Sequence, residues 1–307
     1  MSPLTGIALK VVSVCLFVVM SALIKATSAD VPPGEAVFFR SFFAVPVILG
    51  WLAMRGDLRH GWKTRAPLNH VWRGLVGTSA MGLGFAGLGL LPLPEVTAIG
   101  YAAPLLVVVF AAMFLEERVG RFRLSAVAAG MIGVLIVLSP RLSVGTGADT
   151  GQTLGAVLVL MGAVCAALAQ VFVRKMVHTE ATAAIVLWFS ITATLLSLLT
   201  APFGWAMPGA GAIALLVVAG LLGGLGQIFL TSSYRFAEAS LVAPFDYTSM
   251  LLALIVGYVF FDEVPTAPML AGAAIVIAAG IAIILRERYL GLQRSRQRAV
   301  TGTVGKL

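Results

Sequence analysis

Charged residues, cysteine and histidine are all scarce in this sequence, and each scarcity excludes a class of protein. Only 11% of the 307 residues are charged, whereas soluble domains carry about 25%. The two cysteines, Cys15 and Cys165, lie inside apolar runs, so neither a disulfide framework nor a metal cluster is indicated. The three histidines fall in predicted loops. A membrane-embedded enzyme, which needs reactive groups clustered in one geometry, is therefore disfavoured, and we expect no cofactor and no metal.

Apolar residues make up 60% of the chain, and the mean hydropathy is +1.01. They fall in repeated runs of about 20 residues, the length at which an α-helix crosses roughly 30 Å of hydrocarbon. The sequence therefore predicts an all-α integral membrane protein with ten transmembrane helices. We place these spans at residues 4–27, 34–54, 72–90, 94–115, 122–138, 153–173, 182–201, 211–233, 239–261 and 267–285.

The lysine and arginine residues predict how these helices are oriented. With the N-terminus in the cytoplasm, all but three of the 21 lysines and arginines lie on the cytoplasmic side; the exceptions are Lys25, Arg40 and Arg141. Such a bias over short loops is strong positive-inside evidence and places both the N- and C-termini in the cytoplasm. Because the basic residues are scattered, the pI near 10.0 does not indicate a nucleic-acid partner. The first span has no cleavage pattern, so we expect it to be retained.

The chain divides near its middle. A segment rich in glycine, serine and threonine separates two sets of five spans. We predict a first five-helix repeat at 1–140, a periplasmic linker at 141–152, a second repeat at 153–288, and a basic, solvated and partly mobile cytoplasmic tail at 289–307. Because each half has an odd number of spans, such repeats must be inverted in the membrane, as in many secondary transporters with a central cavity.

Several features recur in the same order in both halves. Glycines crowd the third and eighth predicted helices, and a glutamate opens the helix that follows each of them, Glu95 and Glu238. The run from Gly82 to Gly87 matches a dinucleotide-binding fingerprint, but no strand precedes it. We interpret the glycines as sites where helices pack closely.

Charges inside predicted spans are costly, at about 2.5–3.5 kcal/mol for a mid-helix position, and therefore informative. Lys25 lies near the outer end of the first span, where it either extends to the interface or serves the transport pathway. Arg40 lies about six residues into the second span, and we expect it to pair with an acid on the outer side such as Glu95. These three residues are our candidates for charge pairing or gating.

Asp246 is the one carboxylate well inside a predicted span. It follows Pro244, which cannot donate a helical hydrogen bond, so we expect this turn to be kinked or unwound. Pro104 interrupts the corresponding helix of the first half, and two interrupted helices indicate a central site. Asp246 could bind a cationic group, carry a coupling proton or accept hydrogen bonds. Our candidate residues for a substrate-binding cavity are Tyr101, Trp188, Gln227, Asp246 and Tyr247.

Several motifs resemble the EamA-type branch of the drug/metabolite transporter superfamily. In the first half they are Glu35-Ala-Val-Phe-Phe-Arg-Ser-Phe-Phe-Ala44 and Leu91-Pro-Leu-Pro-Glu-Val-Thr-Ala98, and in the second half Ala239-Ser-Leu-Val-Ala-Pro-Phe-Asp-Tyr-Thr-Ser249. The similarity extends over residues 4–288. It implies two inverted five-helix repeats around a central cavity and export of small metabolites by alternating access. The aromatic-amino-acid exporters of the YddG type are the nearest functional analogy.

We therefore expect a multi-pass secondary transporter of the cell inner membrane, with the lipid bilayer and a small-molecule substrate as its partners. The favoured substrates are amino acids, including aromatic ones. The alternatives are another metabolite class (S-adenosylmethionine, a sugar or a nucleotide derivative) and multidrug export within the same superfamily. The sequence leaves the choice between monomer and homodimer open. Small relatives that expel drug cations carry a glutamate in the middle of the first helix, and Val14-Cys-Leu-Phe-Val18 has none.

Overall fold

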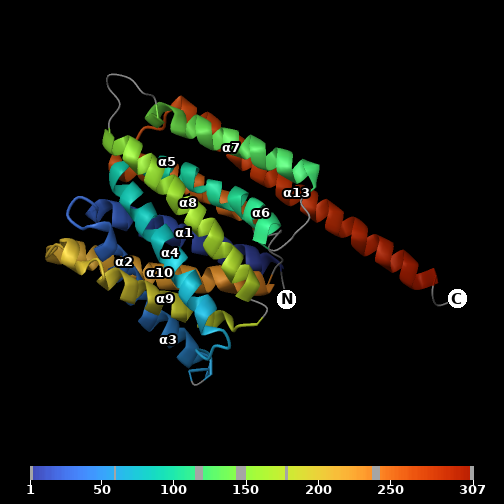
Figure 1. The fold of residues 1–307 in the computed structure, drawn as a ribbon, viewed down its shortest axis with the longest axis horizontal. Coiled ribbons are helices and arrows are strands. Elements are labelled where there is room, and N and C mark those ends of the chain that lie inside the picture. The colour runs from blue at the N-terminus through green and yellow to red at the C-terminus, as the bar shows by residue number, and fades with distance from the viewer. Residues whose placement is uncertain are drawn as a thin grey trace.

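The computed structural model describes residues 3–58, 60–114, 120–142, 150–176, 179–236 and 243–304, and within these ranges it is a bundle of helices without a strand (Figure 1). The first half contains α1 (Pro3–Thr27), α2 (Pro33–Phe42), α3 (Ala44–Met54), α4 (Pro67–Leu90), α5 (Leu93–Gly100), α6 (Ala102–Phe114) and α7 (Arg121–Leu142). The second half contains α8 (Thr150–Met176), α9 (Thr182–Leu198), η1 (Ala201–Phe203), α10 (Ala210–Phe236), η2 (Ala243–Tyr247), α12 (Thr248–Phe261) and α13 (Ala267–Val304).

Each predicted span coincides with one helix or with two consecutive helices. In the described part of the chain, seven helical segments are long and apolar enough to cross a membrane, and two shorter apolar helices, Thr182–Leu198 and Phe245–Phe261, accompany them. The 24-residue α4 is long enough, but its six glycines and Arg73 lower its hydropathy, and it is outside this set. These are the features of an integral, multi-pass membrane protein, and the number of ten crossings stays a prediction.

Prolines explain where the helices break. The predicted span 34–54 is interrupted at Phe43, and the span 94–115 at Tyr101. Pro46 and Pro104 have no N–H to donate to the carbonyls four residues earlier, on Phe42 and Gly100, which are the last residues of α2 and α5. Each helix therefore ends at the residue whose carbonyl group has lost its hydrogen-bond donor.

Around Pro244 the chain is not wound as an α-helix. Residues Ala243–Tyr247 form the 3-10 helix η2, and α12 begins only at Thr248. The turn that contains Asp246 is thus wound differently from the helix that follows it. The beginning of the predicted span, including Glu238, lies outside the described residues.

The two halves pack against each other in a reciprocal pattern. Helix α1 lies against α10 and α4 lies against α8, while α2 meets α9 and α7 meets α13. Glycine permits some of these approaches: a Cβ atom on Gly272 of α13 would lie 2.5 Å from the carbonyl oxygen of Gly133 on α7, and one on Gly87 would lie 2.1 Å from Val159 of α8. Gly82 has no such neighbour within 4 Å, so close packing does not explain every glycine of α4.

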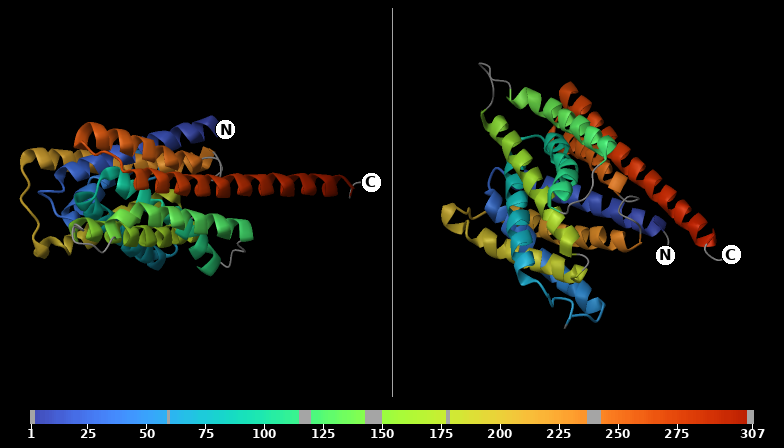
Figure 2. Two further views of the ribbon diagram at one scale, coloured as in Figure 1. Left: turned by 90° about the horizontal axis from the view of Figure 1, so that it is seen from above. Right: turned by 45° about the vertical axis from the view of Figure 1, so that its right-hand side comes forward.

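Both ends of the chain lie at the same end of the bundle, which we call the terminal end; the opposite end, between Thr27 of α1 and Pro33 of α2, is the linker end (Figures 1 and 2). Helix α13 does not stop at the predicted end of its span, Leu285, but continues to Val304 and projects beyond the bundle (Figure 2). The basic tail predicted at 289–307 is therefore helical as far as Val304.

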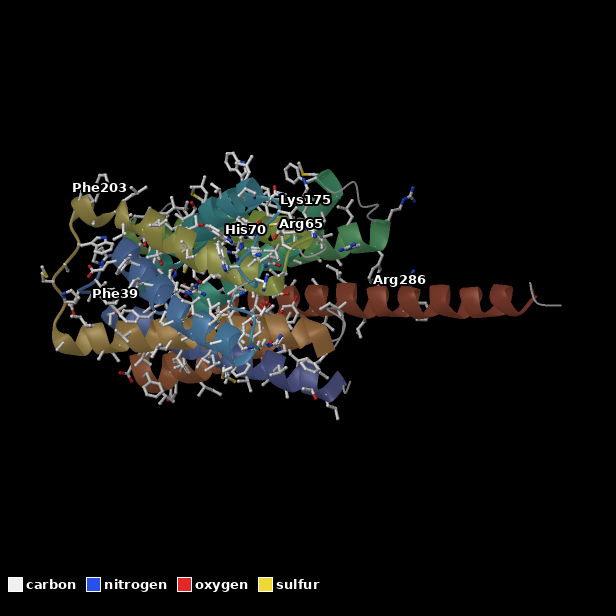
Figure 3. The ribbon with its side chains drawn as sticks, turned by 90° about the horizontal axis from the view of Figure 1, so that it is seen from below. Phe39, Arg65, His70, Lys175, Phe203 and Arg286 are labelled. Atoms are coloured by element: carbon white, nitrogen blue, oxygen red, sulfur yellow. The ribbon has the colours of Figure 1, made fainter. Side chains whose placement is uncertain are left out.

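Two buried glutamates connect the halves, one at each end of the bundle. At the linker end, Glu35 Oε2 accepts the N–H of Ala206 (3.0 Å), in the segment leading into α10. At the terminal end, Glu180 Oε1 accepts the N–H of Arg65 (2.8 Å) and of Ala66 (3.0 Å), just before α4. Figure 3 shows Arg65 and Phe203 towards these opposite ends. Each half therefore holds the segment that leads into the glycine-rich helix of the other half.

Candidate functional site

Two tyrosines meet where the helix of each half is broken. Tyr101 lies between α5 and α6, Tyr247 ends η2, and their rings are 5.1 Å apart in an edge-to-face arrangement. The hydroxyl groups of Tyr101 and Ser249 share a hydrogen bond of 2.6 Å, and Ser249 Oγ donates to the carbonyl of Asp246 (2.7 Å). Three of the candidate cavity residues, Tyr101, Asp246 and Tyr247, are thus brought together.

Asp246 forms an ion pair that the sequence analysis missed. Its carboxylate lies 2.7 Å from Nζ of Lys10 on α1; the side chain of Lys10 is 2% exposed, whereas that of Asp246 is 49% exposed. One turn along α1, Ser13 Oγ donates to the carbonyl of Gly226 on α10 (2.8 Å). We had counted Lys10 among the cytoplasmic charges, although its position inside the first predicted span was a signal that it needs a partner.

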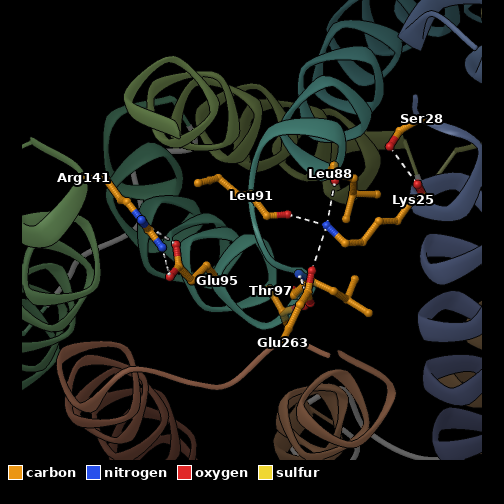
Figure 4. A network of polar contacts seen from close by, with 9 residues as sticks. Lys25, Ser28, Leu88, Leu91, Glu95, Thr97, Arg141 and Glu263 are labelled. Carbon is orange, nitrogen blue, oxygen red and sulfur yellow. Dashed lines mark hydrogen bonds and ion pairs between the residues drawn. The ribbon is translucent and has the colours of Figure 1, made fainter. Parts of the chain in front are cut away.

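Lys25 is the centre of a network at the linker end (Figure 4). Its ammonium donates to the carbonyls of Leu88 (3.1 Å) and Leu91 (2.7 Å) and pairs with the carboxylate of Glu263 (2.9 Å). The other oxygen of Glu263 accepts the N–H of Leu93 (2.8 Å). Lys25 therefore does not extend to the interface. It connects α1 to the α4–α5 junction of its own half and to the α12–α13 junction of the other half.

Glu95 lies in the same region, but its partner is not Arg40. Arg141 makes two contacts with the Glu95 carboxylate, from Nε (2.9 Å) and from Nη2 (2.6 Å), and this fork also appears in Figure 4. Arg141 contacts Gln152 as well, which ties the end of α7 to the start of α8. The expected Arg40–Glu95 pair is therefore wrong. Two-point binding by the planar guanidinium of Arg141, at the end of the helix next to α5, satisfies Glu95 instead.

Arg40 lies buried among α2, α4 and α9, without an ion-pair or hydrogen-bond partner among the described residues. Its neighbour is a second buried arginine, Arg73 of α4, and both guanidinium groups approach the ring of Phe189 on α9. The sequence analysis did not consider Arg73, because it placed that residue at the cytoplasmic edge of the third span.

Trp188 and Gln227 are not joined to the tyrosine pair by any described contact. Trp188 Nε1 donates to the carbonyl of Trp62 (2.9 Å), and its ring is 6.3 Å from that of His70. It belongs to the terminal end. Gln227 is half-buried on α10, one residue after Gly226.

The chemistry available at these sites is that of binding. Among the described residues, no group of three or more His, Cys, Asp or Glu side chains is placed to hold a metal ion. The site around Asp246 offers two opposite charges, two tyrosine rings and hydroxyl groups. Polar and charged groups of this kind, placed beside aromatic rings, are typical of sites that bind small molecules.

Comparison with known proteins gives the family. The sequence model of the EamA-like transporter family matches residues 4–139 and, a second time, residues 153–286. A crystal structure with 21% sequence identity has the same fold, with a TM-score of 0.66 over 93% of this chain and 98% of that one.

Three similar proteins are named transporters. The pseudopaline exporter CntI of Pseudomonas aeruginosa is 31% identical over 91% of this chain and 95% of its own length. A riboflavin transporter of Rhizobium johnstonii is 30% identical over 83% of this chain and 82% of its own. An S-adenosylmethionine uptake transporter of Rickettsia felis is 28% identical over 83% of each chain. Their names indicate transport of small metabolites in either direction, and the chain described here belongs to the EamA-like transporter family.

Proposed function

We propose that this protein is a secondary transporter that exports small zwitterionic metabolites, amino acids first among them, across the inner membrane by alternating access. The observation that carries the proposal is the ion pair of Lys10 and Asp246 beside Tyr101 and Tyr247. The buried ammonium of Lys10 pairs with the half-exposed carboxylate of Asp246, and a carboxylate can also accept the ammonium group of a substrate. Aromatic rings next to it favour substrates with an apolar or aromatic side chain.

We infer that the chain crosses the membrane ten times, as two inverted repeats with both termini in the cytoplasm. The double match to one family model supports this inference, as does the reciprocal packing of α1 on α10 and α4 on α8. The strong positive-inside bias supports this orientation, in which the linker end is periplasmic. In this arrangement the substrate would bind between the halves, beside the ion pair of Lys10 and Asp246.

We infer that the Lys25 network acts as the gate at the periplasmic end. Lys25 and Glu263 come from opposite halves, and Glu263 also holds the backbone of Leu93. Movement of one half against the other would have to separate these groups. The breaks at Tyr101 and η2 are the places where α5–α6 and η2–α12 can bend.

The proposal is tested by counterflow in proteoliposomes. Vesicles are loaded with one unlabelled amino acid and exposed to a labelled one, over a panel that includes aromatic, acidic and basic members. We expect aromatic or aliphatic amino acids to exchange. The same assay is repeated with S-adenosylmethionine, riboflavin, a sugar and a drug cation. Exchange of one of these compounds, without exchange of any amino acid, would assign the chain to one of the other carrier classes.

Asp246→Asn tests the role of the carboxylate. We expect substrate affinity to fall, because the neutral amide cannot pair with a substrate ammonium, and transport to lose any pH dependence that Asp246 confers. Asp30→Asn, in the turn between α1 and α2, is the matched control and should leave transport unchanged. Unaltered affinity and an unaltered pH profile in Asp246→Asn would remove this residue from the binding site.

A further inference from the structure

Two arginines are buried side by side without a counter-ion among the residues that the structure describes. Arg40 on α2 is 6% exposed and Arg73 on α4 is 9% exposed. Nε of Arg40, and Nε and Nη1 of Arg73, are buried and have no hydrogen-bond partner. Buried polar groups are normally hydrogen-bonded, and a buried charge is normally paired. Three guanidinium nitrogens without a partner in one place therefore indicate a missing ligand.

An aromatic ring orients both cations. The guanidinium carbon of Arg73 lies 3.5 Å from the ring centre of Phe189, and that of Arg40 lies 5.8 Å from the same centre. The ring occupies the flat face of Arg73, so its N–H groups point outward in the plane of the guanidinium. This is the geometry that binds a carboxylate through two parallel hydrogen bonds.

Glycines keep space for these side chains. A Cβ atom on Gly77 of α4 would lie 2.9 Å from Phe189, and one on Gly223 of α10 would lie 3.1 Å from Nε of Arg40. Two hydroxyl groups on the same helices, of Ser41 next to Arg40 and of Thr78 next to Gly77, are also buried without a partner. The guanidinium N–H groups are thus donors without an acceptor among the described residues, and an anion would supply one.

The second half has no such cluster. Ser190 occupies the position that corresponds to Arg40 in the shift that pairs Phe39 with Phe189. The two positive charges therefore belong to one side of the bundle. A structural requirement shared by both repeats would not explain them.

The cluster is separate from the site at Asp246. A Cβ atom on Gly223 would meet both Arg40 and Met20 of α1, so the arginines lie near Met20. Lys10, which pairs with Asp246, precedes Met20 by ten residues, or roughly 15 Å along the helix. The two sites therefore lie at different levels along α1.

We propose that Arg40 and Arg73, positioned by Phe189, form a binding site for the carboxylate of a transported metabolite. The inference rests on the proposed function, and it narrows the substrate class to compounds that carry an acid group. A substrate with both an acid and an amine places its acid at this site and its amine at the Asp246 site, in turn or at once according to its length.

The test uses Arg40→Met and Arg73→Met, with Arg55→Met as the matched control. Arg55 also stacks on an aromatic ring, that of Trp51 at 4.5 Å, but it is exposed. The thermal unfolding midpoint of the purified full-length protein is measured with amino acids, dicarboxylates and hydroxy acids, each compared with its amide or amine analogue. We expect at least one carboxylate, but not its analogue, to raise the midpoint of the wild type and of Arg55→Met, and neither buried-arginine variant to respond.

The ligand-free midpoint separates binding from packing. If the arginines serve a ligand, replacing either one removes an unpaired buried cation, and the ligand-free protein keeps or gains stability. A lower ligand-free midpoint in both variants, combined with no response of the wild type to any carboxylate, would show that the stack is structural and overturn the site. Equal responses to acids and their analogues would overturn it as well.

Transport distinguishes this inference from the proposed function. Counterflow of a carboxylate substrate in the wild type that persists at full affinity in Arg40→Met and Arg73→Met refutes the site and leaves the transporter assignment intact. A protein whose unfolding midpoint rises with a carboxylate, but which exchanges no amino acid in the proteoliposome assay, would support the site and contradict the proposed amino-acid export.

Discussion

The change of Glu263 to glutamine tests whether the Lys25 network holds the two halves together. The three N–H groups of an ammonium are all used at Lys25, by the carbonyls of Leu88 and Leu91 and by the carboxylate of Glu263. The two side chains are only 13% and 12% exposed. A hydrogen bond to a charged group contributes about 1.5–3 kcal/mol. Breaking a fully buried pair costs about 3–5 kcal/mol, because the remaining charge is left without its partner.

The two carbonyls stay in place in Glu263→Gln, and the amide oxygen can still accept a hydrogen bond. We therefore expect this variant to lose roughly 2 kcal/mol of unfolding free energy, within the range for a hydrogen bond to a charged group and below that for breaking a fully buried pair. Lys25→Met should lose about as much or more, because it leaves the carboxylate and both carbonyls without the lysine.

The assay is a double-mutant cycle on unfolding in mixed micelles with increasing SDS. It compares the wild type, Lys25→Met, Glu263→Gln and the double variant. We expect the double variant to be more stable than the sum of the single losses predicts, with a coupling energy of about 1.5 kcal/mol. The control cycle uses Lys63→Met in place of Lys25→Met, because Lys63 is exposed in the α3–α4 connection. Additive losses, to within about 0.5 kcal/mol, would refute the role of the network.

Three further predictions follow from packing, from a shifted pKa and from a hydrogen bond. Gly272→Ala should destabilise the protein by about 1–3 kcal/mol, because its Cβ would lie 2.5 Å from the carbonyl oxygen of Gly133; Gly82→Ala, with no atom within 4 Å, should be neutral or stabilising in the same unfolding assay. Burial acts to raise the pKa of Glu180, but hydrogen bonds from the Arg65 N–H, the Thr64 hydroxyl and the Ala66 N–H, together with His70, hold that pKa below its ordinary value. A carboxyl whose pKa is lowered in the folded state stabilises the fold above its unfolded pKa, near 4.3, and loses this contribution as the pH falls through the folded pKa. Unfolding free energy measured against pH should therefore drop in this acid range for the wild type but not for Glu180→Gln, and identical profiles would contradict the assignment. Tyr101→Phe removes the hydroxyl that meets Ser249 at 2.6 Å and should cost about 1 kcal/mol, whereas Tyr289→Phe on α13, where the residue is exposed, should cost nothing; equal stabilities for the two variants would show that the Tyr101 hydroxyl is not stabilising.

Much of the fold could be predicted because apolar run length and proline position act locally. The spans follow from the thickness of hydrocarbon. The unwound turn at Pro244 follows from a missing N–H, and the same rule accounts for the breaks at Phe43 and Tyr101, although the sequence analysis did not apply it to Pro46. The end of α13 was not predictable in this way, because the polar residues after Leu285 continue the helix without an apolar signal.

The candidate site was predicted only in part, because ion pairs depend on which helices are neighbours. Tyr101, Asp246 and Tyr247 were found from their position at proline-interrupted turns, and they meet in the structure. The partners Lys10 and Arg141 were missed, since sequence distance does not reveal that α1 packs beside η2 or that the end of α7 lies beside α5. Arg40 was noticed for its burial but was assigned the wrong neighbour.

The reciprocal attachment by Glu35 and Glu180 has a consequence for how the chain is assembled. The backbone before α4 leaves the ribosome long before Glu180, which accepts its N–H groups, has been synthesised. Conversely, the carboxylate of Glu35 lacks the N–H group that it accepts until Ala206 has been synthesised. Neither half completes these contacts until the second half has been synthesised, so the first half remains an incomplete unit until then. A gene cut between the halves should therefore give a stable product only when both pieces are made in the same cell.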